Sequence, residues 1–366
     1  MTPVSAKSRT PIESAGIWFL QSGIQEPAGG VARYYRLDGA GNARISTEIT
    51  GYAVSTLLYL FERTGQSSYL DAAARAGDFL ANTAWDANLQ IFPFEYSALS
   101  GPEAPAQLAY FFDCGIIVRG LLKLWEATGN TLYRDVASRT ALSMQRDFTQ
   151  EGVTHPILSL PSKAPLPYTG QWSRSPGCYQ LKSALAWREL HELAGDLAAA
   201  EFYESAAEQA LGSHESFLPA ETAEKTVDRL HAYLYFLEGL LPCASQASCA
   251  DALRSGIQQV GYYSRRYAIS LERSDVYAQL LRIRLFAAQL GCAPLDRGAA
   301  EEELHRLKQF QAAHPDGRVD GSFYFGRKGG EWLPFANPVS TAFCLQAIEM
   351  WEDFSAGLLL DRRDLI

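Results

Sequence analysis

Two segments of this chain, 60–75 and 124–139, carry nearly the same sequence. Leucine, glutamate, threonine, glycine, tyrosine, aspartate, alanine and arginine return in register at a constant offset of 64 residues (124 − 60). Each copy has the pattern of an apolar helix, a glycine that ends it, a short turn and the start of a second helix. Because one helical hairpin cannot bury its apolar face alone, the repeat predicts an array of hairpins.

Apolar residues at helical spacing recur along the rest of the chain, although the third to fifth copies match the repeat only loosely. A helix over 12–21 lacks a partner, and the last apolar helix has little sequence after it, so pairing the two would close a ring. The sequence therefore predicts an all-α fold, an (α/α)6 toroid of six hairpins. Its apolar helices are expected to begin near Thr47, Asp113, Tyr179, Arg229, Ser274 and Pro338.

The predicted domain organisation is a single toroid over residues 11–356, preceded by a flexible N-terminus (1–10) and followed by a C-terminal tail (357–366). The connections that precede the apolar helices are long and rich in glycine, proline and aromatic residues, whereas those inside each hairpin are short. Long ordered loops gathered at one end of a scaffold usually carry function. These segments are 23–46, 84–109, 148–177, 212–225, 261–273 and 314–337.

Charge and motifs exclude several classes of protein. The formal net charge is −9, and no run of Lys or Arg is longer than the pair Arg265-Arg266. This balance argues against a nucleic-acid surface and against an anionic membrane surface, but an acidic sugar needs only one or two arginines. There is no phosphate loop, no dinucleotide-binding motif and no metalloprotease motif. We expect no cofactor, no metal and no membrane insertion, and a cytoplasmic location; the oligomeric state stays open.

The six cysteines show no spacing typical of zinc sites. Cys243 and Cys249 flank a short turn and could pair in an oxidising compartment, whereas buried free thiols are the ordinary expectation for cysteines in apolar helices. The sequence leaves this pairing open.

Two acids lie at matching points of the two best repeats. Glu48 and Asp113 are 65 residues apart (113 − 48), against the repeat offset of 64. Two carboxylates at one site are what glycosidic bond cleavage uses, one as the acid and the other as the base or nucleophile. The alternative is that Glu48 stabilises the first turn of its helix and Asp113 caps one. We interpret them as a candidate catalytic pair.

His231 is the third catalytic candidate. It lies one turn into a predicted inner helix, and Asp228 and Tyr235 share its helix face at i−3 and i+4. Histidine is the side chain most easily poised near neutral pH, so these neighbours could orient it for acid–base work. A histidine packed in the core is the competing interpretation.

Candidate substrate-binding residues come from the predicted helix starts and from the aromatic loops. Aromatic faces stack on sugar rings and arginine grips carboxylates, although the same residues can also cap helices or fasten loops. The candidates are Tyr34, Tyr52, Trp172, Arg174, Tyr179, Asp275, Tyr277, Phe323 and Asn337.

Four phrases resemble the six-hairpin glycosidase-like (α/α)6 toroids, and among them poorly characterised bacterial members found with surface-polysaccharide genes. They are STEITGYAVSTLLYLFERTG (46–65), FFDCGIIVRGLLKLWEATGN (111–130), RLHAYLYFLEGLL (229–241) and NPVSTAFCLQAIEMW (337–351). The resemblance spans nearly the whole chain and implies a carbohydrate-active enzyme. In unsaturated uronyl hydrolases of this superfamily, acids at inner-helix starts carry catalysis, and Glu48 and Asp113 hold such positions here.

Three functions follow as alternatives. The first is acid–base hydrolysis of a glycosidic bond in a bacterial poly- or oligosaccharide, with Arg174 as a clamp for an acidic sugar. The second is a uronyl epimerase or lyase that uses His231 with Tyr179 or Tyr277. The sugar 2-epimerases of the superfamily use paired histidines, whereas this chain offers only His231 on an inner helix. The third is a non-catalytic toroid that binds glycan or protein.

Overall fold

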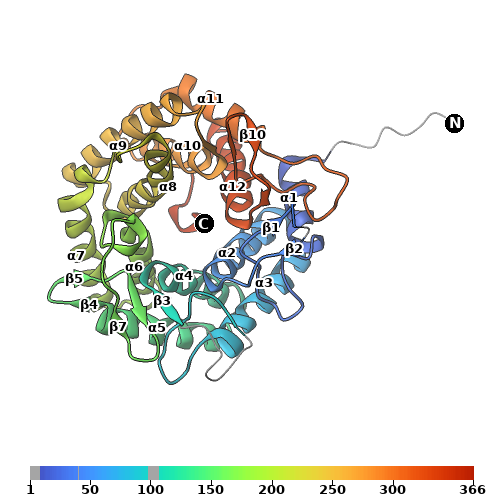
Figure 1. Cartoon of the computed structure of the whole chain (residues 1–366). Helices are drawn as coiled ribbons and strands as arrows, with labels where there is room; N and C mark the ends of the chain where they lie inside the picture. Colours follow the sequence, from blue (N-terminus) through green and yellow to red (C-terminus); the bar gives the residue numbers. More distant parts are fainter. Residues whose placement is uncertain (1–8, 40, 98–106) are drawn as a thin grey trace.

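The computed structural model describes residues 9–39, 41–97 and 107–366. Over these residues the chain forms twelve α-helices in two concentric rings (Figure 1). The inner helices are α2 (Thr47–Thr64), α4 (Phe111–Thr128), α6 (Leu181–Ala194), α8 (Ala223–Leu240), α10 (Ser274–Gln289) and α12 (Pro338–Ser355). The outer helices are α1 (Pro11–Gln21), α3 (Ser67–Phe79), α5 (Thr131–Phe148), α7 (Leu197–Ser213), α9 (Ala247–Arg266) and α11 (Arg297–Lys308).

The ring closes between the two ends of the chain. Helix α12 packs against α10 on one side and α2 on the other, and α1 packs on α12 as its outer partner. Figure 1 shows the first, blue helices beside the last, red ones. The predicted all-α (α/α)6 toroid, with its first and last helices paired, is confirmed.

The glycines of the repeat end the inner helices as expected. Gly65, Gly129 and Gly195 follow α2, α4 and α6 with φ of 68°, 70° and 70°, in the left-handed region that favours glycine. Asn130 and Asp196 then cap the next outer helix, because each side chain accepts a hydrogen bond from a backbone N–H of its first turn. The turns inside the hairpins are therefore short because the sequence supplies both the stop and the start.

Close packing of α2 on α4 depends on two further glycines. A Cβ atom at Gly51 would lie 2.9 Å from the Cα of Ile117, and one at Gly120 would lie 2.7 Å from the backbone oxygen of Gly51. These contacts leave no room for a methyl group, so the two helices approach backbone to backbone. This approach brings together the first turns of α2 and α4.

The long connections carry short strands. The sheet β11–β1–β2 joins the first long loop to the last one, and β10–β9–β8 and β3–β6–β7 hold the other loops together. A two-stranded sheet, β4–β5, follows α5. The strands are β1 (Tyr35–Arg36), β2 (Gly41–Asn42), β3 (Leu108–Tyr110), β4 (Thr149–Gln150), β5 (Val153–Thr154), β6 (Ile157–Ser159), β7 (Ala164–Pro165), β8 (Glu272–Arg273), β9 (Gly326–Lys328), β10 (Glu331–Trp332) and β11 (Phe335–Ala336). We call the end of the ring that carries these connections the loop end.

One predicted helix start is wrong. Helix α8 begins at Ala223 rather than near Arg229, because the side chain of Thr222 caps it by accepting from the N–H of Lys225. Gly239, near the end of α8, packs against Leu181 at the start of α6. Helix α8 therefore extends further toward the loop end than its neighbour α6.

The segment after α12 turns back under the ring. A short 3₁₀ turn, Arg362–Asp364, leads to Leu365 and Ile366, which are both buried. Figure 1 shows this end of the chain at the centre of the ring. In the described part of the chain, no helix combines the length and the apolar character that crossing a membrane requires.

All six cysteines are buried and carry free thiols. The Sγ atoms of Cys243 and Cys249 lie 2.9 Å apart across the turn between them, and the two thiols are not bonded in this structure.

Candidate active site

The two candidate catalytic acids occupy the first turns of adjacent inner helices. Glu48 follows the cap of α2, where the Ser46 side chain accepts from the N–H of Ile49. Asp113 lies in the first turn of α4 and is only 5% exposed. Helices α2 and α4 pack against each other, so their first turns, which carry the two acids, are neighbours at the loop end.

Burial raises the pKa of both carboxyls, so each keeps its proton to a higher pH than usual. Burial raises the pKa of Glu48 from 4.5 to about 7, although the positive charges of Arg33 and Lys182 lower it. Burial raises the pKa of Asp113 well above its usual value, and the negative charge of Glu48 raises it further. One carboxyl oxygen of Asp113, Oδ2, is buried and has no hydrogen-bond partner within the described chain. An acid in this state can donate a proton near neutral pH.

Two arginines from the loops lie near this part of the site, Arg33 acting on both acids and Arg174 on Tyr110. The charge of Arg33, which precedes β1, lowers the pKa of both carboxyls. Arg174 interacts with the phenol of Tyr110, whose own pKa is raised by burial and by the charge of Asp113. Both guanidinium groups remain accessible, since Arg174 is exposed and the Arg33 side chain is 47% exposed. Glu95 partly balances this charge, because its Oε1 lies 3.8 Å from Nη1 of Arg33.

A second polar cluster surrounds His231 on α8. The indole of Trp172 donates to Asp228 Oδ2 at 2.7 Å, and its ring meets the imidazole edge-on at 5.2 Å between centroids. Arg273 donates to Asp228 at 3.1 Å and makes two hydrogen bonds to Asp275, of 3.0 and 2.6 Å. Asp228 thus contacts both Trp172, which packs on His231, and Arg273, which also binds Asp275.

His231 is held neutral in this cluster. Burial lowers the pKa of its imidazole from 6.5 to about 3, and the adjacent positive charge of Arg273 lowers it further, against the opposite effect of Asp228. A histidine with this pKa accepts a proton poorly near pH 7. It can still donate or accept a hydrogen bond as a neutral group.

Three phenols lie between the acid pair and the His231 cluster. The pKa of Tyr52 and of Tyr235 is raised by burial and by the charge of Glu48. The pKa of Tyr179 is raised by burial and by the charge of Asp113. Tyr179 also meets Trp172 edge-on at 5.0 Å, and its hydroxyl donates to the backbone of Ser175 at 3.2 Å. These aromatic side chains connect the two halves of the site.

The remaining predicted binding residues are engaged in the framework. The hydroxyl of Tyr277 donates to Glu272 at 2.9 Å, and the side chain of Asn337 caps α12 by accepting from Ser340 at 3.0 Å. Phe323 is fully buried, so it has no face left for a ligand and we leave it out of the proposed site. Tyr34 is partly exposed and its ring packs edge-on against Phe335.

Sequence reasoning missed four residues that the fold brings to the site. Arg33 stands in a glycine-rich loop and Tyr110 ends a short strand, so neither has a periodic signal. Arg273 directly precedes α10, next to the predicted Asp275. Lys182 carried the clearest signal, because it is a lone charge in the apolar beginning of α6.

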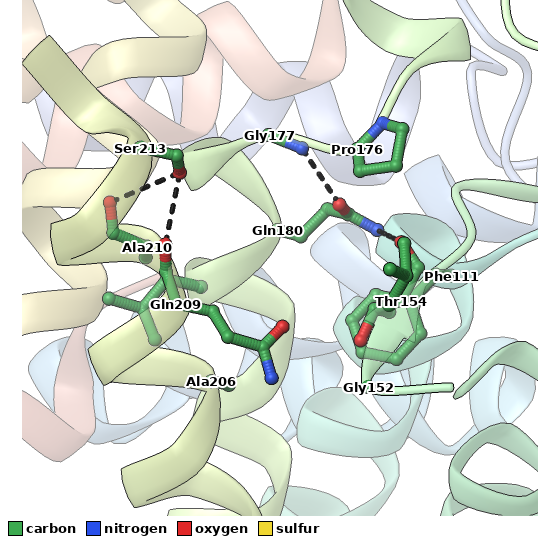
Figure 2. Close-up of a pocket in the computed structure, with 12 residues that line it drawn as sticks. Phe111, Gly152, Thr154, Pro176, Gly177, Gln180, Ala206, Gln209, Ala210 and Ser213 are labelled. Atoms are coloured by element: carbon green, nitrogen blue, oxygen red, sulfur yellow. Dashed lines mark hydrogen bonds between the residues drawn. The ribbon is translucent and has the colours of Figure 1, made fainter. Parts of the chain in front are cut away.

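A cavity in the outer wall is separate from these groups. It has a volume of about 210 Å³ and lies between α7 and the loop segments at 152–154 and 176–181. Gln180 is one of the residues that line it (Figure 2). Its side-chain amide accepts a hydrogen bond from the N–H of Gly177 and donates one to the backbone oxygen of Thr154. The candidate acids do not line it. Over the described residues, no three His, Cys, Asp or Glu side chains come together as a metal site would require.

Comparison with known proteins identifies the fold. No family model and no curated protein matches the sequence. Among solved structures, a sugar epimerase from a ruminal bacterium has a TM-score of 0.71 at 10% identity, over 96% of this chain and 100% of that one. Cellobiose 2-epimerase from Bacillus thermoamylovorans has a TM-score of 0.71 at 12% identity, over 90% and 95%.

A third similar structure is the alpha-1,6-mannanase from Salegentibacter, with a TM-score of 0.58 at 12% identity over 93% of this chain and 99% of that one. A variant of that mannanase was solved with alpha-1,6-mannotriose. At these identities the likeness concerns the fold, which isomerising and hydrolysing enzymes share. This chain has the fold of the six-hairpin glycosidase-like (α/α)6 toroids.

Proposed function

We propose that this protein is a carbohydrate-active enzyme that hydrolyses a glycosidic bond in an acidic bacterial poly- or oligosaccharide. The observation that supports this most is the pair Glu48 and Asp113, two acids in the first turns of neighbouring inner helices, where burial raises the pKa of both and the charge of Glu48 raises that of Asp113 further. The pair disfavours folding, because burial opposes both negative charges. Ionisable side chains that stay buried although burial disfavours their charge are typical of catalytic sites.

The two acids would have different roles. Asp113 is the more deeply buried acid and feels the charge of Glu48, so it keeps its proton and donates it to the leaving oxygen. Glu48 lies near the positive charges of Arg33 and Lys182, so it ionises first and acts as the base or nucleophile. Arg33 and Arg174 would hold the carboxylate of an acidic sugar. Trp172 offers a partly exposed ring for stacking on a sugar.

The epimerase or lyase alternative is less favoured by the same contacts. Proton abstraction needs a base whose pKa is near the working pH, and the pKa of His231 is lowered to about 3. Tyr277 donates to Glu272, whose pKa the neighbouring Arg327 and Arg306 lower against the effect of burial. That arrangement holds the phenol in its protonated form.

The test is product analysis with acidic bacterial polysaccharides and uronate-containing oligosaccharides, with new reducing ends and product masses as the readout. We expect wild type to cleave one of them and both Glu48→Gln and Asp113→Asn to lose at least ~100-fold in kcat. Glu224→Gln is the matched control, because Glu224 is also a first-turn acid of an inner helix but is exposed and pairs with Lys328.

Three outcomes would contradict the proposal. Cleavage that survives in either acid variant would exclude the carboxylate pair. Solvent deuterium entering a sugar without chain cleavage would indicate epimerisation. Saturable glycan binding with no turnover, unchanged in both variants, would indicate a binding toroid.

A further inference from the structure

A groove opens at the outer edge of the loop end, separate from the candidate acids. The outer helices α7 and α9 end at the loop end, because the short turns inside the hairpins lie at the other end of the ring. Both helices contact the inner helix α8. The groove lies between the 3₁₀ turn that follows α7 (His214–Ser216), α8 and the second half of α9. Its volume is about 500 Å³, a size typical of pockets that hold small ligands.

Tyrosine rings form one wall of this groove. Tyr262 is 52% exposed, so its ring is available for contact from solvent. The ring meets that of Tyr263 edge-on with 5.1 Å between centroids, and the guanidinium of Arg266 lies 5.9 Å from its centroid. Tyr263 in turn stacks on Tyr267 at 5.9 Å between centroids. These contacts restrict the exposed ring of Tyr262 to one orientation.

The base of the groove is a hydrogen-bonded pair. Tyr233 of α8 lines the groove although it is only 1% exposed, and its hydroxyl is hydrogen bonded to Nδ1 of His214 at 2.9 Å. Helix α9 approaches this ring closely at Gly256, where a Cβ atom would lie 3.1 Å from Cε1 of Tyr233. The base is therefore closely packed and preformed.

Uncharged polar side chains supply the hydrogen-bonding groups of the groove. Gln258 is exposed, and its amide has no hydrogen-bond partner within the described part of the chain. Gln259 donates through Nε2 to the backbone oxygen of Leu218 at 3.4 Å, so its amide oxygen can still accept. The hydroxyl of Ser255 donates to the backbone of its own helix at 2.9 Å and can also accept. Of the described residues that line the groove, only Glu215 carries a full charge.

This combination of groups fits a neutral sugar chain. A sugar ring has an apolar face of C–H groups that stacks on an aromatic ring, and hydroxyls around it that both donate and accept. A purely apolar ligand would leave the amides of Gln258 and Gln259 without partners. An acidic sugar would meet the charge of Glu215, and no cation lines the described groove to offset it.

A band of aromatic rings links the groove to the candidate active site. Trp172, which packs on His231, meets Tyr179 edge-on at 5.0 Å between centroids. The ring of Phe217 lies 6.3 Å from that of Tyr179 and stacks on that of Tyr233 at 6.3 Å. The groove and the candidate active site therefore belong to one continuous part of the loop end, so a glycan of several sugar units can contact both.

We propose that this groove is a second glycan-binding subsite, which stacks a neutral sugar on Tyr262 and binds its hydroxyls through Gln258 and Gln259. The inference rests on the proposed function in one respect, that the ligand is a glycan. The substrate then carries neutral sugars in addition to the acidic sugar that Arg33 and Arg174 would hold.

Binding without turnover tests the groove. Isothermal titration calorimetry in the Asp113→Asn background measures the dissociation constants of three neutral probes, cellohexaose, maltohexaose and α-1,6-mannohexaose, and of one acidic probe, hexagalacturonate. We expect at least one neutral probe to bind with a Kd below about 5 mM. Tyr262→Ala should weaken that binding at least ~5-fold, because it removes the stacking face.

Three more variants identify the groups that bind. Gln258→Ala should weaken the same binding at least ~3-fold, because it removes the free amide. Tyr262→Trp keeps an aromatic face and should keep the affinity within ~2-fold or raise it. Ile269→Ala is the control, because Ile269 follows α9, is 89% exposed and does not line the groove. Circular dichroism confirms that each variant folds.

Several results would overturn this assignment. Binding of no neutral probe, or affinities that Tyr262→Ala and Gln258→Ala leave unchanged, would exclude a glycan subsite in the groove. If only hexagalacturonate binding depended on Tyr262, the sugar held there would be acidic rather than neutral. If no sugar bound and sedimentation showed a dimer that Tyr262→Ala dissociates, the groove would hold a second copy of this chain.

Activity separates this inference from the proposed function. If a polysaccharide is cleaved, Tyr262→Ala should raise its KM ~5-fold with kcat unchanged, and should leave both constants for the shortest cleaved fragment within ~2-fold. If wild type cleaves nothing while Tyr262→Ala weakens neutral binding, hydrolysis fails and the subsite stands. If cleavage occurs and neither affinity nor KM responds to Tyr262→Ala, hydrolysis stands and the subsite is refuted.

Discussion

Replacing Glu48 by glutamine keeps the size of the side chain and removes the charge that burial opposes. The pKa of Glu48 is raised from 4.5 to about 7 in the folded protein. Each pKa unit corresponds to about 1.4 kcal/mol, so ionised Glu48 lowers the free energy of unfolding by up to about 3.5 kcal/mol. The substitution should therefore stabilise the protein where Glu48 is ionised, while it abolishes the proposed activity.

The sign of the effect depends on pH. Below pH 4 the carboxyl of Glu48 is protonated in both the folded and the unfolded chain, so its burial does not lower the free energy of unfolding. Between pH 4.5 and about 7, Glu48 is ionised in the unfolded chain but still largely protonated in the folded protein. The free energy of unfolding therefore falls as the pH rises through this range. We expect Glu48→Gln to match wild type within ~0.5 kcal/mol at pH 4 and to exceed it by about 3 kcal/mol at pH 8.

Urea denaturation followed by circular dichroism at pH 4, 6 and 8 measures this difference. Glu208→Gln serves as the control, because Glu208 is exposed on α7 and its replacement should change stability by less than ~0.5 kcal/mol at every pH. A gain below ~1 kcal/mol at pH 8, or an equal gain at pH 4 and pH 8, would refute the interpretation that burial opposes the charge of Glu48.

Three further predictions concern a buried charge cluster, the packing of helices and the protonation of His231. Glu238→Gln leaves the two buried cations that it pairs with uncompensated, and should lower the free energy of unfolding by about 3–5 kcal/mol in urea titrations. Gly51→Ala forces a methyl group against Ile117 and should cost about 1–3 kcal/mol, whereas Gly212→Ala, in open space on the exposed face of α7, should gain about 0.5–1 kcal/mol; equal effects would refute the packing argument. The imidazole of His231 should keep its neutral chemical shifts between pH 8 and pH 5 in NMR spectra of ¹³C-labelled histidine, because its pKa is lowered to about 3, and a titration midpoint near 6.5 would contradict that.

The sequence by itself determined the architecture. The repeat with its glycine stops, the apolar helices and the unpaired helices at either end together predicted a closed toroid, because each of these signals is local or periodic along the chain. The sequence also predicted that Glu48 and Asp113 lie in the first turns of their helices, since the two acids occupy nearly equivalent positions of the repeat. The start of α8 was misplaced because its cap, Thr222, lies in a polar stretch where no periodicity marks the boundary.

Only the tertiary structure decided which side chains act on one another. Arg33 comes from a loop without a periodic signal, and Arg273 reaches Asp228 from 45 residues away. The backbone of Ile366 meets Lys182 across 184 residues of sequence. Such contacts depend on closure of the ring, which brings distant segments together through packing. The pKa of a carboxyl depends in turn on that burial and on the charges around it, so the chemistry of Glu48 and Asp113 belongs to the folded ring rather than to the sequence around either residue.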